Sequence, residues 1–226
     1  MRKIREFVNY SEFTDVISSV QLIATVVTTV LRQPVLWKWI VVAAHNGLQG
    51  AMVCNLSGTD GTGALRESSR KRMLAFLQDA KPGDPVPDEW LADFNNLLKW
   101  IQEPNRTVGY TSWHPTASQL KHIAKLHELR NQFSHYVPGS WSIEAIGLPA
   151  ITATALDGTE HLMLSGGYVL AQFTGNQRRA LEHSFKSART GLAALERQQC
   201  ELAAKKKQPQ IAPTNSWTAR KPGRGQ

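Results

Sequence analysis

Cysteine is scarce in this sequence: its 226 residues contain only Cys54 and Cys200. Two cysteines cannot form a zinc site with each other, and no residues near either of them have the spacing of metal ligands. The Gly-x-Ser-x-Gly, His-Glu-x-x-His and paired-cysteine motifs are also absent, which excludes the common hydrolase and zinc-enzyme classes. We therefore expect no metal and no other cofactor, and a location in the reducing cytoplasm.

We expect neither a leader peptide nor a membrane span in this sequence. The charged residues at its start are followed by Glu-Phe-Val-Asn-Tyr and not by an apolar signal region. The most apolar stretch, residues 35–56, is interrupted by Lys38, His45, Asn46 and Gln49, each of which costs about 1 to 3 kcal/mol or more at the centre of a bilayer. This stretch therefore predicts a buried helix, and we expect no membrane partner.

Acidic residues are missing from the C-terminal end of the chain, which is basic. Of the net charge of +8, residues 205–226 contribute +6, so the rest of the chain carries only +2. We expect residues 1–204 to form one domain, because their length suits a single core. Residues 205–226 are rich in Pro, Gly, Asn and Gln, which predicts a disordered basic tail. Such a tail is either a solvated arm or weakly attracted to nucleic acid or anionic lipid.

Apolar residues recur at helical spacing along most of the chain, which predicts an all-α protein. Residues 148–165 are ambiguous between a helix and two short strands around Asp-Gly-Thr, and we favour the helix. Short connections between the elements predict an antiparallel helical bundle. The other expected helices cover about residues 16–33, 35–56, 64–78, 87–103, 120–133 and 176–204.

Polar side chains stand among the apolar residues of one predicted helix, in the stretch LHELRNQFSHYVPGSW. At about 100° per residue, Arg130, Asn131 and His135 fall on one arc of this helix, together with His127 and Ser134. A solvated arc would need no further explanation. The polar residues therefore either belong to a functional site or are an incidental polar cluster at the end of a helix.

Apolar residues of the same helix indicate where this polar arc lies. Leu126, Leu129 and Phe133 form a packed stripe on the other side. Leu120 and Ile123 fall on the polar arc itself, one or two turns earlier, where a fully solvated face would not carry them. We therefore expect the arc to begin against protein and to open into a cleft, with its polar residues partly desolvated.

The side chains on the arc suit chemistry on a phosphodiester. A histidine titrates near neutral pH and can transfer a proton. A guanidinium binds phosphate oxygens in pairs and stabilises charge that grows in the transition state, while an asparagine can orient either group. RNA supplies its own nucleophile in the 2′-hydroxyl, so metal ligands are not required.

The residues LRNQFSHY resemble the Arg-Asn-x-x-x-His signature of the HEPN superfamily, which comprises all-α nucleotide-binding and ribonuclease domains. The resemblance carries over only Arg130, Asn131 and His135, and implies that Arg130 and His135 are catalytic with Asn131 in support. On their position beside these residues, we also expect His127, Ser134 and Tyr136 to be supporting residues. In some toxin members a tyrosine stands two residues after the histidine, whereas Tyr136 follows it directly.

Further expectations follow from this resemblance. It implies a metal-independent endoribonuclease that acts as a toxin or phage-defence effector, a homodimer whose two motifs face one cleft, and an antitoxin or defence partner protein. Some members of the superfamily bind without cutting, so a non-catalytic module for dimerisation, partner binding or nucleotide binding is the alternative.

The chain contains a second Arg and His pair with the same spacing, Arg178 and His183. Its arginine is followed by Arg179 and not by asparagine, and its helix leads into the charged C-terminal stretch. We interpret this second pair as a chance occurrence of a loose pattern.

Two other groups of polar residues have both a structural and a functional interpretation. His45, Asn46 and Gln49 form a polar stripe on an apolar helix, which suggests either a hydrogen-bonded core network or a lining of the same cleft. A cationic cluster in the third predicted helix is typical of a solvated face, and its functional alternative is contact with an RNA backbone. The members of this cluster are Arg66, Arg70, Lys71 and Arg72.

Overall fold

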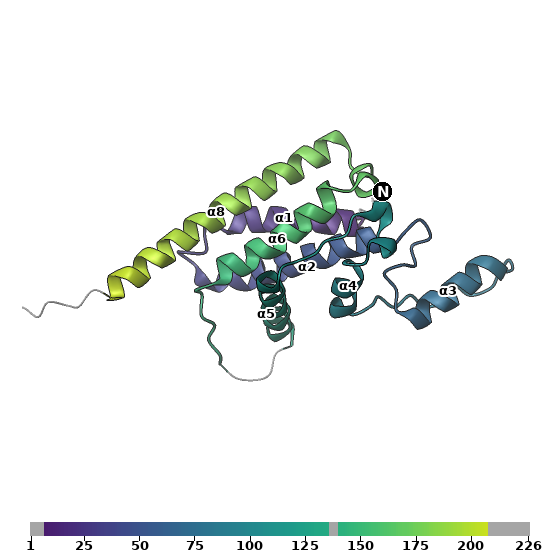
Figure 1. The fold of residues 1–226 in the computed structure, drawn as a ribbon, viewed down its shortest axis with the longest axis horizontal. Helices are drawn as coiled ribbons and strands as arrows, with labels where there is room; N and C mark the ends of the chain where they lie inside the picture. The colour runs from purple at the N-terminus through teal and green to yellow at the C-terminus, as the bar shows by residue number, and fades with distance from the viewer. Residues whose placement is uncertain (1–6, 136–139, 208–226) are drawn as a thin grey trace, which may run out of the picture.

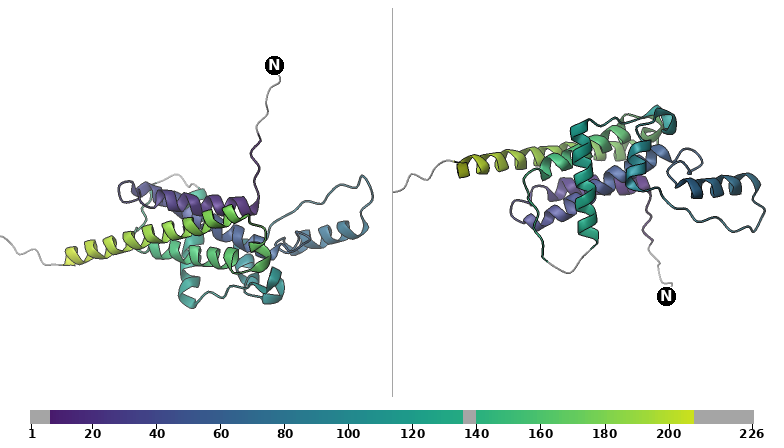
Figure 2. Two further views of the ribbon diagram at one scale, coloured as in Figure 1. Left: turned by 90° about the horizontal axis from the view of Figure 1, so that it is seen from above. Right: turned by 60° about the horizontal axis from the view of Figure 1, so that its bottom comes forward.

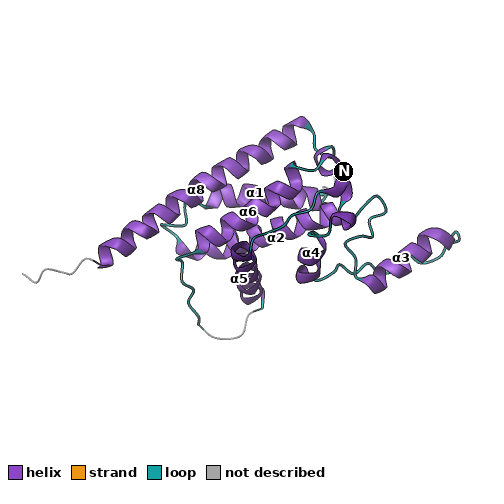
Figure 3. Ribbon diagram, viewed as in Figure 1, coloured by secondary structure: helices purple, strands orange, loops and turns teal. Residues whose placement is uncertain are grey.

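The computed structural model describes residues 7–135 and 140–207. The described part is helical with no strand, and its only β-type contact is an isolated bridge between Leu65 and Leu91 (Figures 1 and 3), which confirms the all-α prediction. None of the described helices is long and apolar enough to cross a membrane. The helices are α1 (Glu12–Val26), α2 (Trp37–Leu56), α3 (Glu67–Asp79), α4 (Phe94–Trp100), α5 (Ala117–Ser134), α6 (Leu148–Leu164), α7 (Gly167–Leu170) and α8 (Gly175–Lys207).

Four long helices, α1, α2, α6 and α8, lie lengthwise and enclose the core (Figure 1). Successive members run in opposite directions in the pairs α1 with α2 and α6 with α8, as the bundle prediction requires. Ile23 of α1, Leu48 of α2, Leu156 of α6 and Phe185 of α8 are completely or almost completely buried. Helix α5 runs steeply across this layer and packs on α2 and α6 (Figure 2).

The ambiguous stretch 148–165 forms one helix, α6. The Asp-Gly-Thr within it is not a turn, because each residue has a role in packing. Gly158 lies under the ring of Trp113, where a β-carbon would approach the ring within 2.5 Å. Asp157 and Glu160 both accept hydrogen bonds from Arg189, which ties α6 to α8.

Several helix boundaries differ from the prediction. The helix expected over residues 16–33 covers Glu12–Val26 instead. The helix expected to include Trp90 begins only at Phe94, because Asp93 accepts a hydrogen bond from the Asn96 backbone N–H at 3.0 Å and so caps it. Helix α8 continues to Lys207, three residues beyond the predicted end. The remainder of the predicted basic tail, residues 208–226, lies outside the described residues.

Helix α3 and the segment that follows it form an arm that projects away from the bundle (Figure 1). At its base, the Arg66 N–H donates to the Trp90 carbonyl oxygen at 2.8 Å and the Ala92 N–H donates to the Ala64 carbonyl oxygen at 3.0 Å. Ser69 is buried against the returning segment. The arm therefore packs mainly on itself.

Candidate functional site

Helix α5 carries the residues of the Arg-Asn-x-x-x-His motif. It begins at a capping box, in which the Gln119 N–H donates to Thr116 at 3.3 Å and the Thr116 N–H donates to the Gln119 side chain at 2.9 Å. Ile123 and Leu126 are buried on the bundle side. This anchoring fixes the rotation of α5 about its axis.

The motif crosses the end of α5. The helix ends at Ser134, and His135 is the first residue beyond it, with a backbone φ of −112° and ψ of 88°. The His135 N–H still donates to the Asn131 carbonyl oxygen at 2.9 Å. Ser134 and His135 are exposed, so the expectation that His135 is partly desolvated does not hold within a single chain. Tyr136 lies outside the described residues.

A line of hydrogen bonds leads from Arg130 into the core. Arg130 Nη1 donates to Asn131 Oδ1 at 3.1 Å, and Asn131 Nδ2 lies 3.3 Å from His127 Nε2. His127 Nδ1 is in turn 2.9 Å from Nε2 of His45 on α2. Arg130, Asn131 and His127 are half-buried, whereas His45 is only 1% exposed.

Phe94, at the start of α4, packs against both imidazole rings of this line. Its ring centroid lies 4.3 Å from that of His45 and 4.7 Å from that of His127, with nearly parallel planes. Burial and the nearby Arg130 guanidinium lower the pKa of His45 to about 3, and the same two causes lower the pKa of His127. Both rings are therefore neutral at pH 7.

Arg130 also borders a cavity of about 360 Å³ between α1, α2 and α5. Asn46 and Gln49 of α2 line this cavity, so the structure places them beside Arg130. His45 is not among the lining residues and belongs to the hydrogen-bonded line in the core. The α2 polar stripe is thus divided: His45 belongs to the core network, whereas Asn46 and Gln49 line the cavity.

Two acidic residues of the cavity were missed by the sequence interpretation. Glu12 and Asp15, in the first turn of α1, line the same cavity as Arg130. Acidic residues are common in the first turn of any helix because they complement its dipole, so the sequence offered no signal that these two belong to the site. Their carboxylates outnumber the single cation of the cavity.

The cationic cluster of the α3 arm is largely occupied by contacts within the arm. Arg66 Nε donates to the Leu91 carbonyl oxygen at 3.1 Å, and Arg72 donates to the Ser69 hydroxyl at 3.3 Å. Lys71 pairs with Glu67 at 3.8 Å, and Arg70 Nε is buried without a partner among the described residues. Exposed Arg66, Lys71 and Arg72 can still reach a ligand, but none of the four lines the cavity at Arg130.

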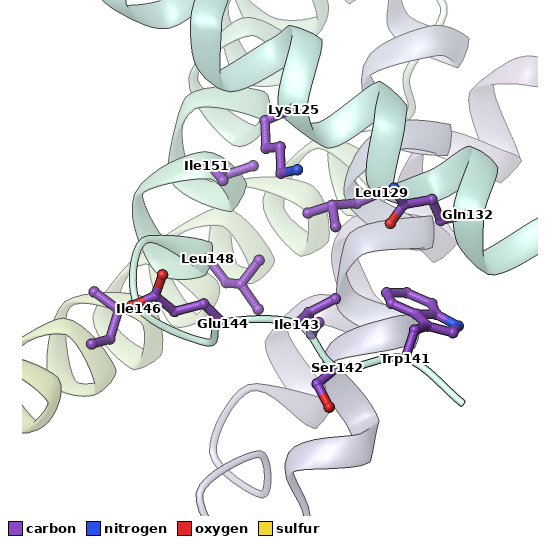
Figure 4. Close-up of a pocket in the computed structure, with 10 residues that line it drawn as sticks. All are labelled: Lys125, Leu129, Gln132, Trp141, Ser142, Ile143, Glu144, Ile146, Leu148 and Ile151. Atoms are coloured by element: carbon purple, nitrogen blue, oxygen red, sulfur yellow. The ribbon is translucent and has the colours of Figure 1, made fainter. Parts of the chain in front are cut away.

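A second cavity, of about 510 Å³, lies on the opposite side of α5 (Figure 4). Figure 4 shows Lys125 and Leu129 of α5 facing Trp141 and Ile143, which belong to the segment that leads into α6. Its lining mixes apolar side chains with polar ones such as Gln132 and Glu144, and it includes no residue of the Arg-Asn-x-x-x-His motif. This cavity is therefore separate from the site of the motif.

Within residues 7–135 and 140–202, no group of three or more His, Cys, Asp or Glu side chains could hold a metal ion. No family model, curated protein or solved structure matches this chain. The geometry of the α5 site is therefore the basis for a functional proposal.

Proposed function

We propose that this protein is a metal-independent endoribonuclease of the HEPN type. The observation that carries the proposal is the set of contacts that Arg130 makes and lacks. This half-buried guanidinium borders a cavity, is held by an asparagine, and forms no salt bridge with any described carboxylate. An oriented guanidinium without a carboxylate partner keeps its remaining N–H groups for a phosphate.

In the proposed reaction, the 2′-hydroxyl of RNA attacks the adjacent phosphorus and the bond to the 5′-oxygen breaks. A base takes the proton of the 2′-hydroxyl, and an acid gives a proton to the leaving 5′-oxygen. The products are a 2′,3′-cyclic phosphate and a 5′-hydroxyl. Arg130 would stabilise the charge on the phosphate oxygens, and His135 would act as the base or the acid.

A homodimer is part of this proposal. One chain contributes a single exposed His135, whereas the reaction uses both a base and an acid. Leu120, on the same side of α5 as the motif, is 37% exposed and offers an apolar contact to a second copy. Light scattering should therefore show a dimer, and a monomer at high protein concentration would contradict this part of the proposal. We also propose a cytoplasmic toxin or defence role, with an antitoxin or other defence protein as partner.

The decisive experiment is RNA cleavage by the purified protein. His135→Ala should lower the rate by about two to four orders of magnitude without unfolding the protein. Wild type should leave 2′,3′-cyclic phosphate ends, spare DNA, and be indifferent to a chelator. His183→Ala is the matched control, because His183 follows Arg178 at the same spacing, and it should leave the rate unchanged.

A non-catalytic binding module is the alternative, and one observation favours it. Glu12 and Asp15 give the cavity an excess of negative charge that would repel an RNA backbone. In this case Arg130, Asn131 and His135 would serve a dimer or partner interface. Equal cleavage by wild type and His135→Ala, or cleavage by neither, would favour this alternative over the nuclease.

A further inference from the structure

The hydrogen bonds that link Arg130 to His45 allow only one assignment of donors and acceptors. A guanidinium can only donate, so Asn131 must present its oxygen to Arg130 and its NH₂ group to His127. His127 Nε2 must then accept, which leaves the ring proton on Nδ1, where it is donated to His45 Nε2. The proton of His45 is therefore on its own Nδ1, which is buried and has no partner among the described residues.

Both imidazole rings are held in place by packing as well as by this line. Phe94 stacks on each of them, and His45 is enclosed by the core. The Asn131 amide thus has a fixed acceptor in His127 and presents its oxygen to Arg130 on the other side. Because Asn131 is held by packed side chains, its hydrogen bond restricts the flexible Arg130 side chain. Arg130 therefore loses less conformational entropy when it binds a phosphate.

From this geometry we infer that His127 and His45 are positioning residues that orient Asn131 and Arg130 at the cavity, and that protonation of His127 releases them. This inference rests on the proposed function of Arg130 as a phosphate-binding group. It adds a titratable residue, His127, that lies outside the Arg-Asn-x-x-x-His motif.

Protonation disrupts the line because it removes the only acceptor of the Asn131 amide. A doubly protonated His127 would turn an N–H toward the Asn131 NH₂ group, so two donors would face each other. Rotating the amide by half a turn would restore this contact but would place the NH₂ group against Arg130. One hydrogen bond is lost in either arrangement, and Arg130 loses its fixed orientation.

Charged and titratable groups around His127 determine the pH at which it becomes protonated. His45 faces it from α2 and Arg130 from α5, while Asp93 at the start of α4 favours the protonated form. Burial and Arg130 outweigh Asp93, so the pKa of His127 is below its usual value of 6.5. The line is therefore intact at neutral pH and is lost in acid.

The first test uses nuclear magnetic resonance of the full chain without RNA. Imidazole ¹⁵N shifts at about pH 7.5 should show both His127 and His45 protonated on Nδ1 only, although neutral histidines in water favour the Nε2 proton. Lowering the pH from there into acid should broaden or shift the Arg130 side-chain N–H signal in step with the titration of His127. An Nε2 proton on His127, or an Arg130 signal that does not respond, would overturn the inference.

The second test is the pH dependence of RNA cleavage in three variants. His127→Phe keeps the stacking on Phe94 but removes the acceptor, so its rate should fall at least about tenfold at neutral pH. His127→Gln can accept from Asn131 and does not titrate, so it should remain active and retain its activity further into acid. His122→Phe is the control, because His122 lies on the same helix and is bonded to Thr154 at 2.8 Å instead; its rate and pH profile should match wild type.

The two tests separate this inference from the proposed function. Nδ1 protons and a responsive Arg130 signal in a protein that does not cut RNA would support the positioning role and reject the nuclease. If wild type cuts RNA, and His127→Phe cuts it equally fast with the same decrease in rate at acid pH, the nuclease is supported and the positioning role is rejected.

Discussion

Two Arg and His pairs with identical spacing occupy very different surroundings in this protein. Arg130 is half-buried, joins a hydrogen-bonded line that ends at a core histidine, and borders a cavity. Arg178 is exposed on α8, and its Nε donates to Glu182 of the same helix at 2.8 Å. His183 is exposed next to it. The arginines, and not the two exposed histidines, distinguish the pairs.

The difference shows what a short pattern can and cannot specify. Residues five apart lie about 140° from each other around a helix whatever surrounds them. A site forms only where a neighbouring helix supplies partners, as α2 and α4 do for Arg130 through His45 and Phe94. Arg178 has no such neighbour within the described residues, because its partner Glu182 comes from its own helix.

The largest expected difference between the pairs concerns RNA cleavage. Arg130→Lys keeps the positive charge but loses the planar fork that binds two phosphate oxygens, so the cleavage rate should fall by about two orders of magnitude. Arg178→Lys should leave the rate within about twofold of wild type. Both rates would be measured on the same RNA at neutral pH, and an equal loss in both variants would mean that the two arginines do not differ in function.

Much of the fold and part of this contrast were predictable from the sequence. The periodicity of apolar residues is local, so it predicted α5 and α6 and placed Arg130 and Asn131 on one arc. The exact end of a helix depends on capping and on tertiary contacts, so the sequence did not determine the backbone conformation of His135, which lies just beyond the end of α5. The contact of His127 with His45 joins residues 82 positions apart, and no local rule predicts which helices cross there.

A smaller effect should appear in the pH dependence of stability. The unfolded chain protonates His45 near its usual pKa of 6.5, whereas burial and Arg130 hold the folded pKa at about 3. Between these values the unfolded state binds more protons, so stability falls as the pH decreases. The expected loss from His45 is about 2 kcal/mol between pH 7 and pH 5. Denaturant unfolding at the two pH values would measure it.

The matched variant for this measurement is His45→Leu, which is apolar and cannot titrate. Its absolute stability is not the relevant quantity, because the comparison is between two pH values within one variant. The acid-dependent loss should shrink by roughly the same 2 kcal/mol. If the acid-dependent loss of stability were unchanged in this variant, it would come from groups other than His45. The link to a core histidine would then no longer distinguish the Arg130 pair from the Arg178 pair.

The smallest expected effect is at the Arg178 pair itself. Glu182→Gln removes the partner of Arg178, yet both side chains are about half exposed, so water and salt already screen their attraction. The arginine also precedes the glutamate, which is the weaker order for such a pair on a helix. The free energy of unfolding should therefore change by less than about 0.5 kcal/mol at low salt and not at all at about 1 M salt. A loss above about 1 kcal/mol that persists in high salt would show that Arg178 is held as firmly as Arg130. The Arg and His spacing alone would then have identified two structured sites in this chain and not one.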